Sequence, residues 1–179
     1  MKYVLFLLLS ASCLSATEKY TIKEHMSAVA NKHNLILSTI SGDKGVDCGI
    51  FSIEDNKPQL LLSTHIKNED IQTFSDTIKS FLSHVNETYG MTVQYACFAG
   101  PGVPSADQDY LQHWRLPYVI DAKEIIAQNN FTSAIIVNDF LALSYGVNFV
   151  EGSKITTLYD APAEKHGRRV IIGAGAGID

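Results

Sequence analysis

The chain has 179 residues, of which 46% are hydrophobic and 18% are charged. A chain of this length suits one domain, or one domain and part of a second, and it can bury a sizeable core. Its apolar content excludes disorder along the whole length. The formal net charge is -5 and the basic residues are scattered, so the chain has no basic field that would hold a nucleic acid.

Residues 1–16 have the pattern of a secretory signal peptide, with a lysine near the start, a short apolar run and then small residues. The apolar run is too short to span a bilayer, which takes about 20 residues. A lipoprotein cleavage just before Cys13, a buried strand and an unusual translation start are the alternatives. A cleaved leader predicts an exported protein with no membrane contact after processing, in which residues 17–33 form an N-terminal extension.

Two cysteines, Cys48 and Cys97, would remain after cleavage behind Ala16. They permit one disulfide, but two free and buried thiols fit the sequence equally well. The cysteines therefore do not decide the compartment of the protein.

Periodicity and turn residues predict alternating strands and helices along the chain. Strands are expected at residues 34–40, 48–53, 60–64, 92–99, 133–137 and 169–172. Helices are expected at residues 70–87, 122–128 and 140–145. Asn68 is expected to cap the first helix, and Asp121, together with Glu124, is expected to cap the second.

These elements predict an α/β fold with a mixed sheet and flanking helices. The hairpins between the first three strands indicate an antiparallel beginning of the sheet. The strand that follows the long helix indicates parallel pairing, because parallel strands need such a crossover connection. A weak domain boundary is expected near residues 100–109, where Gly, Pro, Ser and Asp concentrate.

Asn138 and Asp139 follow a short apolar strand, at the carboxyl end where α/β sheets bind their ligands. A carboxylate in that place can take a proton from a substrate hydroxyl, and the neighbouring amide can orient the hydroxyl. The alternative is that Asp139 only caps the helix that follows it.

Two loops that contain glycine are further candidate sites. Residues 173–177 alternate Gly and Ala after a strand, so their backbone N–H groups can approach a phosphate. Residues 41–45 form a turn in which Lys44 can add positive charge to a phosphate site. A tight structural turn and a solvated turn, respectively, are the alternatives. The histidines do not lie at metal-ligand spacing with another His or Cys, so no metal cage is expected.

Four segments, in their order along the chain, resemble the bacterial glucokinase family of hexokinase-type sugar kinases. They are residues 99–101 (AGP), 116–125 (LPYVIDAKEI), 137–142 (VNDFLA) and 172–177 (IGAGAG). The similarity is good over residues 95–177 and thinner over residues 34–85. The resemblance implies an actin-like ATPase (ribonuclease H-like) fold, with a small α/β domain over residues 34–108 and the start of a larger, truncated α/β domain over residues 109–179.

The glucokinase family transfers the terminal phosphoryl group of ATP, with magnesium, to the 6-hydroxyl of glucose. By the resemblance, Asp139 is the base that takes the hydroxyl proton, Asn138 holds the sugar, and Gly175 lies near the sugar. The resemblance also places five residues near the phosphates of ATP, namely Ser41, Gly42, Asp43, Gly173 and Gly177.

Several positions depart from the family pattern. Thr39 stands where the family has an acidic residue that serves the metal, and Asp43 stands where it has a phosphate-binding Thr. Ala176 replaces a Thr of the second glycine-rich loop, and Trp114-Arg115 replaces a Thr-Asn pair near the sugar. The chain also ends before the Glu and His residues that hold the sugar in the family. Two functions are therefore open: a sugar kinase, or a catalytically inactive remnant that binds a sugar or a partner.

The expected location and partners follow from the same considerations. The family implies a cytoplasmic protein that binds ATP and glucose or a related hexose, whereas a genuine leader implies export to a place where ATP is scarce. A sheet that is cut where the chain ends has an unpaired edge, which favours a homo-oligomer.

Overall fold

The computed structural model describes residues 20–25, 34–150, 152–158 and 170–172. The expected signal peptide and most of the N-terminal extension lie outside these residues. In the part of the chain that is described, no helix is both long and apolar enough to cross a membrane.

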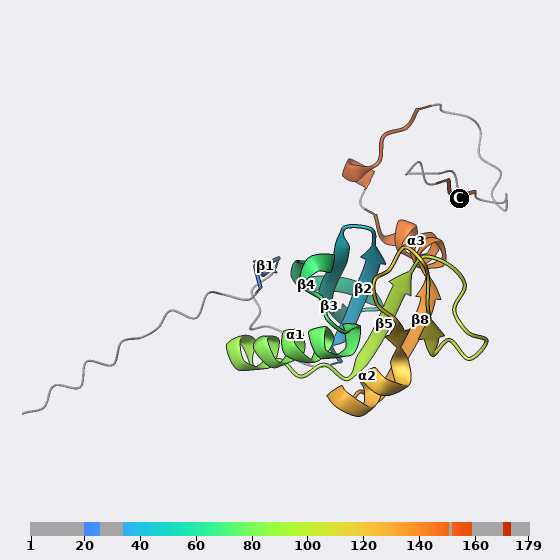
Figure 1. The fold of residues 1–179 in the computed structure, drawn as a ribbon. Helices are drawn as coiled ribbons and strands as arrows, with labels where there is room; N and C mark the ends of the chain where they lie inside the picture. The colour runs from blue at the N-terminus through green and yellow to red at the C-terminus, as the bar shows by residue number, and fades with distance from the viewer. Residues whose placement is uncertain (1–19, 26–33, 151, 159–169, 173–179) are drawn as a thin grey trace, which may run out of the picture.

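The described residues form a mixed six-stranded sheet in the order β1-β4-β3-β2-β5-β8 (Figure 1). The strands are β1 (Lys23–Glu24), β2 (Ile36–Gly42), β3 (Gly45–Glu54), β4 (Lys57–Lys67), β5 (Tyr95–Gly100) and β8 (Ser133–Asn138). β2, β3 and β4 pair antiparallel through hairpins, and β1 adds an antiparallel edge strand to β4. β5 pairs parallel to β2, and β8 pairs parallel to β5. The predicted α/β class, the mixed sheet and its antiparallel beginning are confirmed.

Turn chemistry explains the two hairpins. Gly45 follows the β2–β3 turn with a φ of +153, and a Cβ at this position would lie 2.2 Å from the carbonyl oxygen of Ile66. A side chain therefore does not fit there, and glycine is required. At the β3–β4 turn, Asp55 and Asn56 have φ values of 48 and 60. Two successive residues of positive φ are typical of the tight turns that match the twist of a hairpin, and Asp and Asn tolerate this geometry.

Two helices, α1 (Phe74–Tyr89) and α2 (Ala122–Asn129), cover one face of the sheet (Figure 1). α1 buries an apolar stripe that recurs every three or four residues, formed by Phe74, Ile78, Phe81 and Val85. The sheet contributes a buried residue from each of β2, β3, β4, β5 and β8, namely Leu37, Ile50, Leu62, Phe98 and Ile136. Burial of a side chain of this size contributes about 1.5–3 kcal/mol, so this layer is the core that holds the sheet in shape.

The remaining elements are short. They are η1 (Asn68–Asp70), β6 (Tyr110–Leu111), β7 (Ile120–Asp121), α3 (Asp139–Gly146), η2 (Val147–Phe149) and η3 (Gly152–Lys154). β6 and β7 pair antiparallel within the connection from β5 to α2. β5 and β8 pair in one sheet, although the expected domain boundary at residues 108/109 falls between these two strands. That domain boundary stays a prediction.

α1 is capped by Thr73, and the expectation that Asn68 caps it is wrong. The hydroxyl oxygen of Thr73 accepts the backbone N–H of Asp76 at 3.1 Å. Asn68 begins η1, and residues 71–73 separate η1 from α1. Its side-chain amide instead donates to the carbonyl oxygens of Gly42 and Asp43, at 3.1 and 2.9 Å. Asn68 therefore holds the β2–β3 turn in place.

Two later expectations have opposite outcomes. Asp121 caps α2 as predicted, because its Oδ1 accepts the backbone N–H groups of Lys123 and Glu124 at 2.9 and 3.1 Å. The strand expected at residues 169–172 is wrong for the residues that are described, since Val170 and Ile172 are exposed and have no strand geometry. An apolar run becomes a strand only where a neighbouring strand satisfies its backbone hydrogen bonds.

Cys48 and Cys97 are both free thiols. In the sheet, Cys48 pairs with Thr39, and Cys97 pairs with Ser38. Successive residues of a strand point to opposite faces of a sheet, so the two thiols lie on opposite faces and cannot form a disulfide. Burial raises the pKa of both thiols, which disfavours the reactive thiolate.

Candidate functional site

The carboxyl ends of the three parallel strands lie at one edge of the sheet. β2 ends at Gly42, β5 at Gly100 and β8 at Asn138. The β2–β3 turn and α3 both lie at this edge (Figure 1). Neighbouring strands are about 4.8 Å apart, so the ends of β2 and β8, with β5 between them, are about 10 Å apart. This edge is where open α/β sheets bind their ligands.

Asn138 is the N-cap of α3. Its Oδ1 accepts the backbone N–H groups of Phe140 and Leu141 at 3.0 and 3.1 Å. Its Nδ2 donates to the carbonyl oxygen of Gly102 at 2.9 Å. The side chain therefore ties the loop after β5 to the end of β8, and its expected contact with a sugar stays a prediction.

Asp139 is the first residue of α3, so the capping role that was the alternative for Asp139 belongs to Asn138. Oδ1 of Asp139 accepts the backbone N–H of Phe140 at 2.9 Å. The side chain is half-buried, and it lines a cavity of about 600 Å³. A negative charge is favourable at the N-terminal end of a helix. A carboxylate held in this way at the wall of a cavity can accept a proton from a bound hydroxyl.

Three segments that are distant in the sequence build this cavity. They are residues 101–103 after β5, residues 113–115 between β6 and β7, and residues 138–140 at the junction of β8 and α3. Ile171 also contributes to the lining. A cavity of several hundred Å³ is of the size that takes a small-molecule ligand.

Close packing at two glycines brings residues 113–115 to the cavity. A Cβ at Gly100 would lie 2.6 Å from Cδ2 of Leu111, and a Cβ at Gly102 would lie 2.8 Å from Cδ2 of His113. Gly102 also has a φ of +94, which a residue with a side chain rarely adopts. Leu111 and Ile120 are buried and hold the β6–β7 pair against the end of β5.

Asp109 anchors the connection between β5 and α2, which contains β6 and β7, to the start of α2. Its Oδ1 accepts the hydroxyl of Ser105 at 2.7 Å, and its Oδ2 pairs with Nζ of Lys123. The backbone carbonyl of Asp109 accepts the N–H of Ala122 at 2.8 Å. The hydrogen bonds from Lys123 and Ser105 lower the pKa of Asp109, and the hydrogen bond to Asp109 raises the pKa of Lys123. The connection that carries residues 113–115 is therefore anchored to the start of α2.

His113, Trp114 and Arg115 form one wall of the cavity. The backbone N–H of Arg115 donates to Nδ1 of His113 at 3.3 Å, and the Arg115 guanidinium carbon lies 5.1 Å from the Trp114 ring centroid. The indole is 82% exposed, whereas Arg115 is half-buried. Sequence reasoning marked Trp114 and Arg115 only as departures from a family pattern, and it missed His113. His113 directly precedes Trp114, and this position was the signal in the sequence that could have identified it.

The residues predicted to bind phosphates at the β2–β3 turn do not all point outward. Ser41 is 2% exposed, so its hydroxyl is directed into the core, as is the side chain of Thr39. Gly42 is half-buried and Asp43 is exposed. A phosphate at this turn would therefore meet backbone groups and the Asp43 carboxylate. The assignment of these residues stays a prediction, and Gly173, Gly175 and Gly177 lie outside the described residues.

Among the residues that the structure describes, no group of three or more His, Cys, Asp or Glu side chains is arranged to hold a metal ion. The carboxylates of Asp43 and Asp139 lie at the edge of the sheet formed by the carboxyl ends of β2, β5 and β8, which is called the ligand edge below. Mg²⁺ usually binds through one or two carboxylates together with the phosphates of its substrate. The exposed carboxylate of Asp43 fits that mode.

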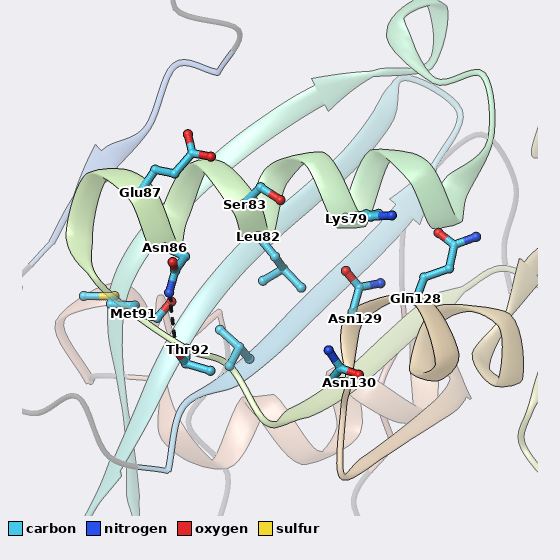
Figure 2. Close-up of a pocket in the computed structure, with 11 residues that line it drawn as sticks. Lys79, Leu82, Ser83, Asn86, Glu87, Met91, Thr92, Gln128, Asn129 and Asn130 are labelled. Carbon is cyan, nitrogen blue, oxygen red and sulfur yellow. Dashed lines mark hydrogen bonds between the residues drawn. The ribbon is translucent and has the colours of Figure 1, made fainter.

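A second cavity, of about 310 Å³, lies between α1 and the end of α2 (Figure 2). Much of its lining consists of amide side chains, from Asn86, Gln128, Asn129 and Asn130. Nδ2 of Asn86 donates to the Met91 carbonyl and the Thr92 hydroxyl, at 3.2 and 3.3 Å (Figure 2). Its lining residues 91–93 and 128–130 precede β5 and β8, so this cavity lies at the opposite edge of the sheet from Asp139. It contains none of the predicted site residues.

A mixed sheet of this order, with helices over one face, belongs to the actin-like ATPase fold class. The glucokinase from an Antarctic psychrotroph shares the fold with a TM-score of 0.62 and 16% identity, over 74% of this chain and 40% of that one. The glucokinase from Balamuthia mandrillaris, solved in complex with glucose, has a TM-score of 0.50 and 19% identity, over 67% of this chain and 34% of that one.

The sequence model of the glucokinase family matches residues 41–179, and the chain belongs to the glucokinase family. The chain spans about 40% of the length of the first glucokinase named above. A search of curated proteins finds no match.

Proposed function

We propose that the protein transfers a phosphoryl group from ATP to a hydroxyl of a hexose, with Asp139 as the general base. The observation that carries this proposal is the half-buried Asp139 carboxylate, which lines a cavity of about 600 Å³ at the carboxyl ends of the parallel strands. Membership of the glucokinase family supports the proposal that a sugar and a nucleotide bind at that edge of the sheet.

In the proposed step, the sugar hydroxyl loses its proton to Asp139, and its oxygen forms a bond with the γ-phosphorus of ATP. The bond between that phosphorus and the β,γ-bridging oxygen breaks, and ADP leaves. Positioning and neutralisation of charge supply most of the rate in such transfers. General base catalysis contributes about 10²–10⁴-fold.

The β2–β3 turn is the proposed site for the ATP phosphates. Asn68 fixes the turn by donating to the carbonyl oxygens of Gly42 and Asp43. Asp43 would reach a magnesium ion bound to the phosphates, which removes the repulsion between its carboxylate and the nucleotide. The glycine-rich segment at residues 173–177 is proposed to complete the phosphate site.

The alternative function is a remnant that binds a sugar or a partner without catalysis. The observation that favours it is the burial of Thr39, which is 1% exposed and carries no charge where the family has an acid for the metal. Binding at the Asp139 cavity would then persist without phosphoryl transfer.

The test is an assay of ADP release by the full chain with ATP, magnesium and glucose. Asp139→Asn keeps the size of the side chain and removes the base, so turnover should fall by at least about 100-fold. Asp55→Asn is the matched control, because it makes the same substitution at the β3–β4 turn, at the far end of β3, and should leave turnover unchanged. Unchanged turnover in Asp139→Asn would refute the base assignment. A folded sample without turnover would favour the remnant.

A further inference from the structure

We propose that the sugar bound beside Asp139 is an anionic one, a hexose phosphate or a six-carbon sugar acid, and that Arg115 binds the anionic group. This inference rests on the proposed function, because it names the class of acceptor for the same cavity. It concerns the wall formed by His113, Trp114 and Arg115.

Few charged side chains line the cavity. Asp139 is the only acidic residue of the lining that the structure describes, and Arg115 is its only arginine or lysine. Within the described ranges, no carboxylate forms an ion pair with Arg115, whereas Lys67 and Lys123 both have one. Arg115 is half-buried, and an anionic ligand would form charge-assisted hydrogen bonds with its guanidinium.

Neighbouring groups hold Arg115 in place. The guanidinium lies over the Trp114 ring, with its carbon 5.1 Å from the centroid. The backbone of the same segment is tied by the Arg115 N–H to His113 Nδ1 and by the Leu116 N–H to the His113 carbonyl, at 3.3 and 3.0 Å. An ordered guanidinium loses less entropy when it binds an anion than a free one does.

His113 adds a second hydrogen-bond donor to this wall of the cavity. Its Nδ1 accepts a backbone hydrogen bond, so the hydrogen of the neutral ring is on Nε2. Nε2 is close to Gly102, another residue of the lining, since a Cβ at Gly102 would lie 3.7 Å from it. The wall therefore offers a guanidinium, an imidazole N–H and an exposed aromatic face. This set suits a sugar or sugar acid with an anionic group better than a neutral sugar.

The chain provides its own probe, because Trp114 is its single tryptophan. The full chain, without ATP, is titrated with glucose, glucose 1-phosphate, gluconate and inorganic phosphate, and the fluorescence of Trp114 is followed. Glucose 1-phosphate and gluconate both retain a 6-hydroxyl. The first tests binding of a phosphate group, and the second, an open-chain sugar acid, tests binding of a carboxylate. At least one of them should bind about tenfold more tightly than glucose and than inorganic phosphate.

Two variants and a control locate the effect. Arg115→Gln should abolish the preference for the anionic sugar, and Arg115→Lys should restore part of the preference. Lys57→Gln makes the same change in net charge at the β3–β4 turn and should change nothing. Equal affinity for glucose and both anionic sugars, no saturable response to either anionic sugar, or an Arg115→Gln variant that keeps the preference would each overturn the inference.

The assay of ADP release separates this inference from the proposed function. Preferential binding of an anionic sugar without any turnover would support the anionic ligand and count against the kinase. Turnover of glucose without a preference for either anionic sugar would support the kinase and overturn the inference.

Discussion

Neighbouring residues at the end of β8 have separate tasks. Asn138 uses its side-chain oxygen to cap α3 and its nitrogen to hold the carbonyl of Gly102. Asn138 is therefore the N-cap of α3. The carboxylate of Asp139, whose Oδ1 accepts the N–H of Phe140, lies at the wall of the cavity. The Asn-Asp pair can thus support a binding loop and a base with two consecutive residues.

Replacement of Asn138 tests this division of tasks. Asn138→Ala removes the cap and the hydrogen bond to Gly102, so the free energy of unfolding should fall by about 1–2 kcal/mol. Asn138→Asp keeps an oxygen for the cap and loses the donor, so it should cost less. Urea denaturation of the two variants measures both values. Equal stability of Asn138→Ala and the unchanged chain would show that the contacts of Asn138 do not support the site.

At the scale of elements, the sequence was sufficient to predict an element where it has a long apolar stripe or clear turn residues at its ends. The apolar spacing predicted α1, and the turn residues between β2, β3 and β4 predicted the hairpins of the sheet. Two-residue strands such as β6 and β7 have no period to detect, and they exist because Leu111 and Ile120 pack at the end of β5.

The candidate site was predictable only in part, for the same reason. Asn138 and Asp139 follow a strand directly, so their place at the ligand edge could be inferred from the sequence. His113 reaches the cavity through contact with Gly102, and this contact has no signature in the sequence. The inward direction of Ser41 depends on the register of β2, which the turn residues alone did not specify.

β8 offers a matched pair for testing the two faces of the sheet. Ile136 is fully buried beneath the helices, whereas Ile135, its neighbour, is 43% exposed on the other face. Ile136→Ala should lower the free energy of unfolding by about 2–5 kcal/mol, and Ile135→Ala by about 0.5 kcal/mol. Both values are measured by urea denaturation. Similar costs at the two positions would contradict the layer arrangement described here.

At the scale of the whole molecule, the ligand edge and the sheet face that the described helices leave open are the two features that relate structure to function. The helices cover one face, while Ile40, Tyr95 and Ile135 leave an apolar surface on the other. Such surfaces mark sites of association in soluble proteins, and a homo-oligomer stays a prediction. The ligand edge carries the predicted base, the β2–β3 turn predicted to bind phosphates, and the wall at residues 113–115.

The central claim is that the cavity beside Asp139 is the sugar site. The most direct measurement is a two-dimensional ¹H–¹⁵N NMR titration of the full chain with glucose and with glucose 1-phosphate. The account predicts that shifts concentrate at residues 101–103, 113–115 and 138–141. Shifts confined to residues 79–93 and 128–130, around the cavity of Figure 2, or no shifts with either sugar, would contradict it.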